Sequence, residues 1–237
     1  MSTFIKARLT KWLGQDHALL HRYSGLKRSI LRYDARLSRD YLSRAPEPKL
    51  QIGGGWSVKS GWLNTDVARF PSVLQMDATK PFPFPNDAFQ FIFCEHMIEH
   101  VSSEAGVGML SECYRVLRPS GVIRMVTPDL AAILGLYDRS SDPRQEAYLS
   151  FFSTVHLHKG KKVNAAAVIN GQFRLWGHQF IYDELTLREV MSDAGFNNLT
   201  RKRLGESEHS QFKGIENERR YPPGLLDFES LALEGCK

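Results

Sequence analysis

The run Leu50-Gln51-Ile52-Gly53-Gly54-Gly55 is typical of a short buried strand that passes directly into a glycine loop. Because glycine has no Cβ, such a loop lets the backbone approach a ligand closely. Two further short strands are predicted at residues 62–66 and 73–77, and each ends in an aspartate, Asp66 or Asp77. Ligands of open α/β sheets bind beyond the carboxyl ends of the strands. The glycine loop and the two aspartates therefore predict one ligand site.

The rest of the chain alternates between strand and helix patterns. Residues 89–94 (FQFIFC) are apolar and aromatic, as expected for a strand covered on both faces. This alternation predicts an α/β fold with a mainly parallel sheet. The other predicted elements, in chain order, are a strand at 49–52, a helix at 103–117 capped by Ser103, a turn at 118–121, a strand at 122–126, a helix from Asp183 to Ala194 stopped by Gly195, and a closing strand pair at 198–204 and 228–234.

The composition is that of a folded protein. The chain has 237 residues, 42% hydrophobic and 24% charged, which fits one larger α/β domain or a core domain with an accessory segment. No apolar run reaches the roughly 20 residues of a membrane span, and no export signal is readable. Three cysteines without a CxxC pair predict a reducing, cytoplasmic setting and no structural zinc.

The positive charge is concentrated at the beginning of the chain. Residues 1–45 hold ten Lys and Arg against three Asp, a net charge of +7, so the remaining residues carry −2. A helical stripe of Leu26, Ile30, Tyr33, Leu37 and Tyr41 runs through this segment and ends before Pro46 and Pro48. We therefore expect a basic helical extension at 1–45 and the main domain at 46–237.

Three roles remain open for the extension: packing on the main domain, contact with an anionic membrane surface or an acidic partner, and RNA binding. Nucleic acid is disfavoured because Tyr33 and Tyr41 belong to the apolar stripe, which leaves no obvious stacking platform. The sequence gives no oligomeric state.

Two nucleotide-binding classes are disfavoured by their missing motifs. A GxxxxGK[ST] phosphate loop is absent, which argues against an NTPase. The dinucleotide motif GxGxxG is also incomplete, because Val58 stands at its third glycine, and this argues against NAD and FAD.

The combined pattern resembles the S-adenosylmethionine-dependent methyltransferases with a Rossmann-like fold, particularly the methyltransferase type 11 group. The resemblance is strong over residues 49–129 and looser over 178–237. It implies a methyltransferase that binds S-adenosyl-L-methionine on a mainly parallel, seven-stranded-type sheet with helices on both faces. The segments that carry it are LQIGGG (50–55), GWLNTD (61–66), MDA (76–78), PFPFPNDAF (81–89), CEHMIEH (94–100) and RVLRPSG (115–121).

The resemblance also implies roles for individual residues. Gly53 and Gly55 would cradle the methionine part of the cofactor, and Asp66 would hold its ribose. The pair Asp77-Ala78 would frame the adenine, and Glu95-His96 would line the methionine side. One departure is clear: only residues 56–61 separate the glycine loop from the next strand, so the usual long helix there must be very short or replaced by a turn.

Several kinds of methyl-transfer chemistry are disfavoured. The Asp/Asn-Pro-Pro-Tyr/Phe motif of many amino-methylating enzymes is absent, and Cys94 lacks the flanking proline of a cysteine nucleophile. Without a carboxylate cluster we expect no metal. What remains is direct displacement on a small-molecule or glycan acceptor, most simply at a hydroxyl, in polysaccharide, lipid or secondary-metabolite assembly. The alternatives are a catalytically silent cofactor-binding partner protein and an RNA methyltransferase that uses the basic arm.

Residues 136–182 have weak periodicity and are predicted to be an insertion that covers the acceptor. The candidate bases are His178, His156 and Tyr182, with His158 and Asp129 as further options. His178 leads, because it lies just before the capped helix at 183–194 and imidazole titrates near neutral pH. The alternative is that His178 only bonds the backbone and shapes a lid.

Overall fold

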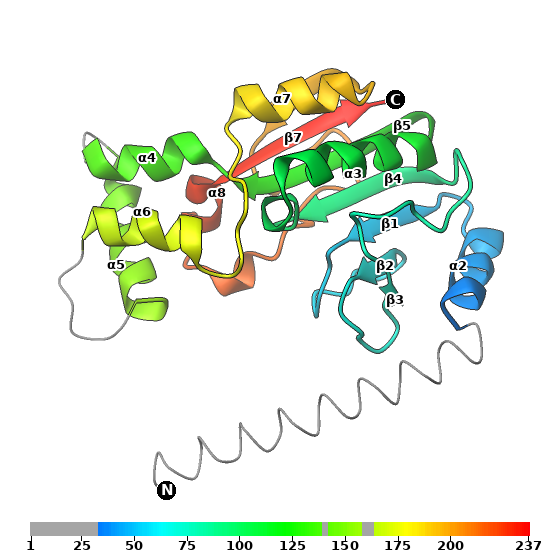
Figure 1. Cartoon of the computed structure of the whole chain (residues 1–237), viewed down its shortest axis with the longest axis horizontal. Helices are drawn as coiled ribbons and strands as arrows, with labels where there is room; N and C mark the ends of the chain where they lie inside the picture. Colours follow the sequence, from blue (N-terminus) through cyan, green and yellow to red (C-terminus); the bar gives the residue numbers. More distant parts are fainter. Residues whose placement is uncertain (1–32, 139–141, 158–163) are drawn as a thin grey trace, which may run out of the picture.

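The structure is a computed structural model that describes residues 33–138, 142–157 and 164–237 (Figure 1). Its centre is a seven-stranded sheet with the strand order β3-β2-β1-β4-β5-β7-β6. Strand β7 runs antiparallel to both of its neighbours, and the pairs among β1 to β5 are parallel. The strands are β1 Lys49–Ile52, β2 Leu63–Asp66, β3 Leu74–Gln75, β4 Phe89–Glu95, β5 Leu117–Pro128, β6 Asn197–Lys202 and β7 Ser230–Cys236.

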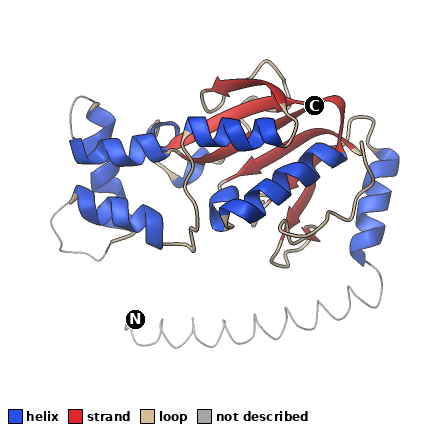
Figure 2. Ribbon diagram, turned by 45° about the horizontal axis from the view of Figure 1, so that its top comes forward, coloured by secondary structure: helices blue, strands red, loops and turns tan. Residues whose placement is uncertain are grey.

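Five of the described helices gather in two places, and α2 lies apart from them beside β3 (Figures 1 and 2). Helices α3 and α7 lie along the sheet, whereas α4, α5 and α6 form a group beyond the carboxyl ends of β4 and β5. The helices are α2 Tyr33–Arg44, α3 Ser103–Val116, α4 Leu130–Asp138, α5 Pro143–Val155, α6 Ala165–Arg174, α7 Glu184–Asp193 and α8 Leu225–Glu229, with short 3₁₀ helices at Ile98–His100 and Glu218–Arg220.

The main core lies between the sheet and α3 and α7. Side chains alternate across a strand, so Ile92 and Cys94 of β4 point into this core while Phe91 and Phe93 point to the opposite face. On the opposite face the cover is a loop at residues 203–217 together with the short helix α8. Cys94 is fully buried and burial raises its pKa, which agrees with a core role.

The loop over the second face is fixed by a buried arginine. Arg124 of β5 donates from Nε to Glu216 Oε1 and from Nη1 to Glu234 Oε1, each at 2.6 Å. Its guanidinium also donates to the carbonyl oxygens of Arg203 and Glu206. Because each of these donors is paired, the charge is tolerated inside the protein.

Helix α2, the described part of the predicted extension, packs on the main domain. Leu37, Tyr41 and Leu42 contact the main core. The Tyr41 hydroxyl oxygen accepts from the Lys49 amide and lies 3.0 Å from the carbonyl oxygens of Lys49 and Gly61, to one of which it can donate. The stripe residues Leu26 and Ile30 lie outside the described residues. Among the described helices, none is long and apolar enough to cross a bilayer.

Three local expectations need correction. Helix α3 is capped by the side chain of Ser102, one residue before the predicted cap. Residues 118–121 are not a free turn but belong to the long strand β5, because Leu117 pairs with Phe89 across a register shift. Residues 136–182 are mostly helical rather than irregular: α5 and α6 bury Tyr148, Phe152 and Val168 in a small core of their own.

Candidate active site

A cavity of about 410 Å³ opens at the carboxyl ends of β1, β2 and β4, and we call it the strand-end cavity. Its volume is within the range of cofactor pockets. Five of the sequence-predicted cofactor residues line it, so the structure brings them together as expected. The lining residues are Ile52, Gly53, Asp66, Val67, Met76, Asp77, Ala78, Thr79, His96, Met97, His100 and Val101.

The glycine loop turns tightly and leads the backbone past this cavity. Gly53 and Gly55 both have positive φ, +68° and +52°, which favours glycine at both positions. A Cβ at Gly53 would lie 2.4 Å from Cγ of Met97, so only glycine lets Met97 pack there. The segment that follows contains no helix before β2, as the short spacing predicts.

Asp66 is oriented by two backbone amides. Its Oδ2 accepts a hydrogen bond from the Gly55 amide and its Oδ1 accepts one from the Ala68 amide, both at 2.8 Å. An ionised carboxylate has about four acceptor positions, so two remain for a ligand. Gly55 itself does not line the cavity, and its contribution there is the hydrogen bond from its amide that orients Asp66.

Asp77 is arranged similarly at the end of β3. Its Oδ1 accepts hydrogen bonds from the Thr79 hydroxyl and amide, and these bonds hold the pKa of Asp77 below its usual value. Ala78, next in the chain, is buried against the core. Glu95, in contrast, is directed away: its Oε1 accepts from the Asn217 amide and it does not line the cavity.

A second cavity of about 330 Å³, which we call the histidine cavity, adjoins the first. His96 and His100 line both cavities. The remaining walls come from the end of β5, from α5, α6 and α8, and from the segment around Trp176. The lining residues are His96, His100, Pro128, Val155, His156, Gln172, Trp176, His178, Tyr221 and Glu229.

His96 stands at the junction in a strained conformation, with φ at +48°. Its Nδ1 lies 3.3 Å from Glu99 Oε1, and its Nε2 lies 3.1 Å from Ser230 Oγ. Burial alone would lower the pKa of His96, but the hydrogen bond and charge of Glu99, together with the charges of Glu229 and Glu95, raise it. The pKa of Glu99 is in turn held below its usual value by His96. The junction therefore favours an imidazolium–carboxylate pair.

His178 has a defined tautomer. Its Nδ1 lies 2.6 Å from the carbonyl oxygen of Gln172, and because a carbonyl only accepts, Nδ1 must carry the proton. The lone pair is then on Nε2. Burial lowers the pKa of His178, so the ring is neutral at pH 7, and it packs edge-on against His100 with 4.8 Å between centroids. This is the form that can accept a proton.

The other candidate bases are placed less favourably. His156 lines the histidine cavity, where its ring contacts Trp176 and burial lowers its pKa. The prediction for Tyr182 needs correction: it is buried in the main core next to Gly106, and burial raises its pKa to about 12. Asp129 is engaged by the Ala131 amide and Arg201. His158 lies outside the described residues.

Three side chains at the edge of the histidine cavity form a candidate metal site that the sequence did not predict. Glu99, His100 and His178 each place one potential metal-ligand atom within 4.8 Å of the others. Glu99 and His100 are neighbours in the quoted CEHMIEH segment, but His178 is far away in the sequence. The expectation of no metal stays a prediction.

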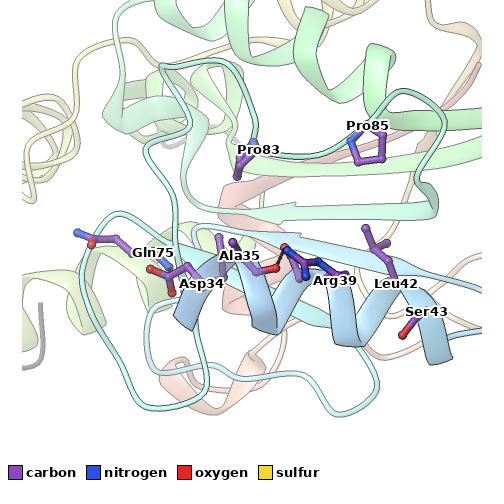
Figure 3. A pocket seen from close by; sticks show the side chains of 10 residues that line it. Asp34, Ala35, Arg39, Leu42, Ser43, Gln75, Pro83 and Pro85 are labelled. Carbon is purple, nitrogen blue, oxygen red and sulfur yellow. Dashed lines mark hydrogen bonds between the residues drawn. The ribbon is translucent and has the colours of Figure 1, made fainter. Parts of the chain in front are cut away.

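Figure 3 shows a third cavity, of about 680 Å³, between α2 and the loop that carries Pro83 and Pro85. It is larger than the other two. It lies beside α2 instead of at the carboxyl ends of β1 and β4, and none of the sequence-predicted cofactor or catalytic residues lines it. We therefore do not assign the active site to this cavity.

Comparisons with known proteins agree with the sequence resemblance. Residues 57–125 match the family model described as "Methyltransferase domain", which confirms that resemblance. No curated protein matches the chain.

Solved structures of methyltransferases are similar to the chain over most of its length. An S-adenosylmethionine-dependent methyltransferase from Archaeoglobus fulgidus is 15% identical, with 91% of this chain and 100% of that chain covered and a TM-score of 0.46. One from Thermotoga maritima is 16% identical, with coverage of 93% and 99% and a TM-score of 0.44. A phosphoethanolamine N-methyltransferase from Haemonchus contortus, solved with S-adenosyl-L-methionine, is 12% identical, with coverage of 84% and 52% and a TM-score of 0.42.

Proposed function

We propose that this chain, an S-adenosylmethionine-dependent methyltransferase with a Rossmann-like fold, methylates a hydroxyl of a small-molecule or glycan acceptor held in the histidine cavity. The observation that carries the proposal is the shared wall of the two cavities. His96 and His100 line both, so a cofactor in the strand-end cavity and an acceptor in the histidine cavity would meet at these residues.

The residues of the strand-end cavity fit the cofactor. Asp66 keeps two acceptor positions for a ribose diol, since its other two receive the Gly55 and Ala68 amides. Asp77 has one oxygen occupied by Thr79, and among the described residues no donor reaches the other, which is available for the adenine amino group. Gly53 leaves the backbone close to the methionine side. When bound, S-adenosylmethionine supplies an electrophilic methyl group on a sulfonium.

We assign His178 as the base. Its Nε2 would take the proton of the acceptor hydroxyl while the oxygen–methyl bond forms and the sulfur–methyl bond breaks. The Gln172 carbonyl supports this role by holding the Nδ1 proton, and it stabilises the imidazolium that results. The remainder of catalysis is positioning, because an in-line displacement needs little further chemistry from the protein.

The direct test is to purify the full chain, identify any co-purified ligand by mass, and measure S-adenosylhomocysteine binding by calorimetry. Methyl transfer is then screened against sugars, lipids, amines and nucleotides with radiolabelled cofactor. We expect cofactor binding and an O-methylated product. Cofactor binding with no transfer to any class of acceptor would favour a catalytically silent cofactor-binding protein. Transfer to RNA would favour an RNA methyltransferase.

For residues 1–45 we propose contact with an anionic membrane surface or acidic partner in addition to the packing of α2. The net charge of this segment supports the proposal. Co-sedimentation with anionic liposomes should be stronger for the full chain than for a chain starting at Pro46, and equal sedimentation at low salt would contradict contact with a membrane surface.

A further inference from the structure

The histidine cavity contains a buried carboxylate that the proposed transfer step does not use. Glu229, the last residue of α8, is 2% exposed and lines the cavity. Its Oε2 accepts a hydrogen bond from Gln172 Nε2 at 3.0 Å and another from the Tyr148 hydroxyl. Burial raises the pKa of Tyr148 well above its usual range, so its hydroxyl keeps its proton and donates at neutral pH.

The second oxygen of Glu229 is different. Within the described residues no hydrogen bond reaches Oε1, and this atom is not among the fully enclosed unpartnered atoms, so it faces the cavity space. A carboxylate oxygen that faces a cavity is a strong acceptor, because a hydrogen bond to a charged group is worth more than one between neutral groups. The site is therefore arranged to receive a donor from a ligand.

The other walls restrict which donor this is. None of the described residues that line the cavity is Lys or Arg, and the ring of His96 is paired with Glu99 and Ser230. The described lining therefore offers a phosphate or carboxylate on the acceptor no free cation, and the Glu229 carboxylate would repel such a group. Trp176 is 48% exposed at the cavity, with its ring edge-on to His156 at 4.8 Å between centroids. Such an aromatic surface beside a hydrogen-bonding carboxylate suits a ligand with one apolar face and several hydroxyl groups.

We infer that Glu229 is the specificity-determining residue for a neutral carbohydrate acceptor, with Oε1 accepting hydroxyl hydrogen bonds and Trp176 covering the apolar face of the sugar ring. The inference rests on the proposed function in one respect, that the histidine cavity receives the acceptor. Within that function it narrows the acceptor to an uncharged sugar and excludes sugar acids and sugar phosphates.

The test uses the full chain with S-adenosylhomocysteine and four groups of probes. These are neutral p-nitrophenyl glycosides of glucose, galactose, mannose and xylose, the matching glucuronide, glucosamine, and glucose 6-phosphate. Saturation-transfer NMR reports binding, and radiolabelled cofactor reports transfer. We expect at least one neutral glycoside to bind, and we expect no binding of the glucuronide or of glucose 6-phosphate. Binding without transfer would keep the inference and count against the proposed function.

Two variants locate the contact. Glu229→Gln should weaken the binding of the neutral glycoside by about 10- to 100-fold, because the side chain that accepts its hydroxyl hydrogen bonds loses its negative charge. Trp176→Ala, at an exposed position, should weaken it by about tenfold. Tyr148→Phe is the matched control: it removes a bond to Oε2 and leaves Oε1 in place, so it should have a smaller effect. S-adenosylhomocysteine affinity verifies that each variant is folded.

Three results would overturn the inference. The first is no saturation transfer to any neutral glycoside at millimolar concentration. The second is preferred binding of the glucuronide, the phosphate or the amino sugar. The third is neutral glycoside binding that is unchanged in both Glu229→Gln and Trp176→Ala.

Discussion

The strand-end cavity and the histidine cavity share a wall but are built differently. The first is made by short segments that follow β1, β2, β3 and β4 directly, and its polar contacts are mostly between backbone amides and nearby carboxylates. The second is made by side chains from α5, α6, α8 and distant loops, held by contacts between residues far apart in sequence. The difference teaches that the shape of the strand-end cavity depends on local backbone geometry, whereas that of the histidine cavity depends on tertiary packing.

The largest effect is expected from changes to His178 in the histidine cavity, which should lower the rate of methyl transfer and leave the strand-end cavity intact. His178→Ala and His178→Gln should reduce methyl transfer by roughly 10²–10⁴, because the proton acceptor is lost, while S-adenosylhomocysteine affinity stays unchanged. Rates and calorimetry on the same preparations separate the two quantities. Transfer within a few-fold of wild type in both variants would eliminate His178 and move the assignment to His156.

The pH dependence of transfer gives the same assignment a second check. Burial lowers the pKa of His178 below its ordinary value of about 6.5. A base acts when neutral, so kcat/KM should be flat from neutral pH upward and fall on the acid side as the ring becomes protonated. The acid limb should disappear in His178→Ala. An acid limb that persists unchanged in His178→Ala would mean that another group titrates there.

The next effect is expected in the strand-end cavity alone. Asp66→Ala should weaken S-adenosylhomocysteine binding by about 1.5–3 kcal/mol, because one or two charge-assisted hydrogen bonds to the ribose are lost. Transfer at saturating cofactor should be retained, since the acceptor side is intact. Calorimetry measures the affinity, and an unchanged value would remove Asp66 from the cofactor site.

A smaller effect is expected from the glycine loop, and the chain supplies a matched control. Gly53→Ala and Gly61→Ala both place alanine at positive φ, +68° and +77°, which costs about 1–2 kcal/mol of stability. Only Gly53→Ala also pushes on Met97, which lines the cavity. The unfolding temperature should fall in both variants, and further in Gly53→Ala because of the clash with Met97. Cofactor affinity should fall only in Gly53→Ala, by about tenfold. Equal affinity in the two variants would contradict a role for the loop.

The smallest effect is expected from chelation. If Glu99, His100 and His178 act without a metal, EDTA should leave transfer within about twofold, a change of under 1 kcal/mol. Elemental analysis should find no stoichiometric metal in the purified chain. Loss of activity in EDTA that zinc restores would instead make the cluster a metal centre and His178 one of its ligands.

Much of the sheet was predictable because its signals are local. The apolar run at 89–94, the glycines that follow β1 and the aspartates that end β2 and the third strand each lie within a few residues of the element they mark. A closing strand pair was also predicted, since strand patterns at the end of the chain remain visible without their partners; its antiparallel direction came from the structure.

The helices over the histidine cavity were harder to predict. Helices α5 and α6 were expected to be irregular, because His156, Trp176 and the lysine-rich turn interrupt the apolar pattern there. They are helical because Tyr148, Phe152 and Val168 pack against one another, and no single stretch contains that information. Tyr182 was misplaced for the same reason: its position before α7 suggested a site, but packing placed its ring in the main core.

The sequence by itself determined the fold class and marked the glycine loop and the strand-end aspartates that share the strand-end cavity, since backbone turns and strand-end carboxylates are encoded by neighbouring residues. The cofactor followed from the family resemblance of these segments. Only the tertiary structure decided which groups share the histidine cavity. His96, Gln172, His178 and Glu229 come together there because the α4–α6 group folds over the ends of β4 and β5. The physical reason is that burial and hydrogen bonding between distant side chains depend on the whole packed chain, whereas a glycine turn depends on a few residues.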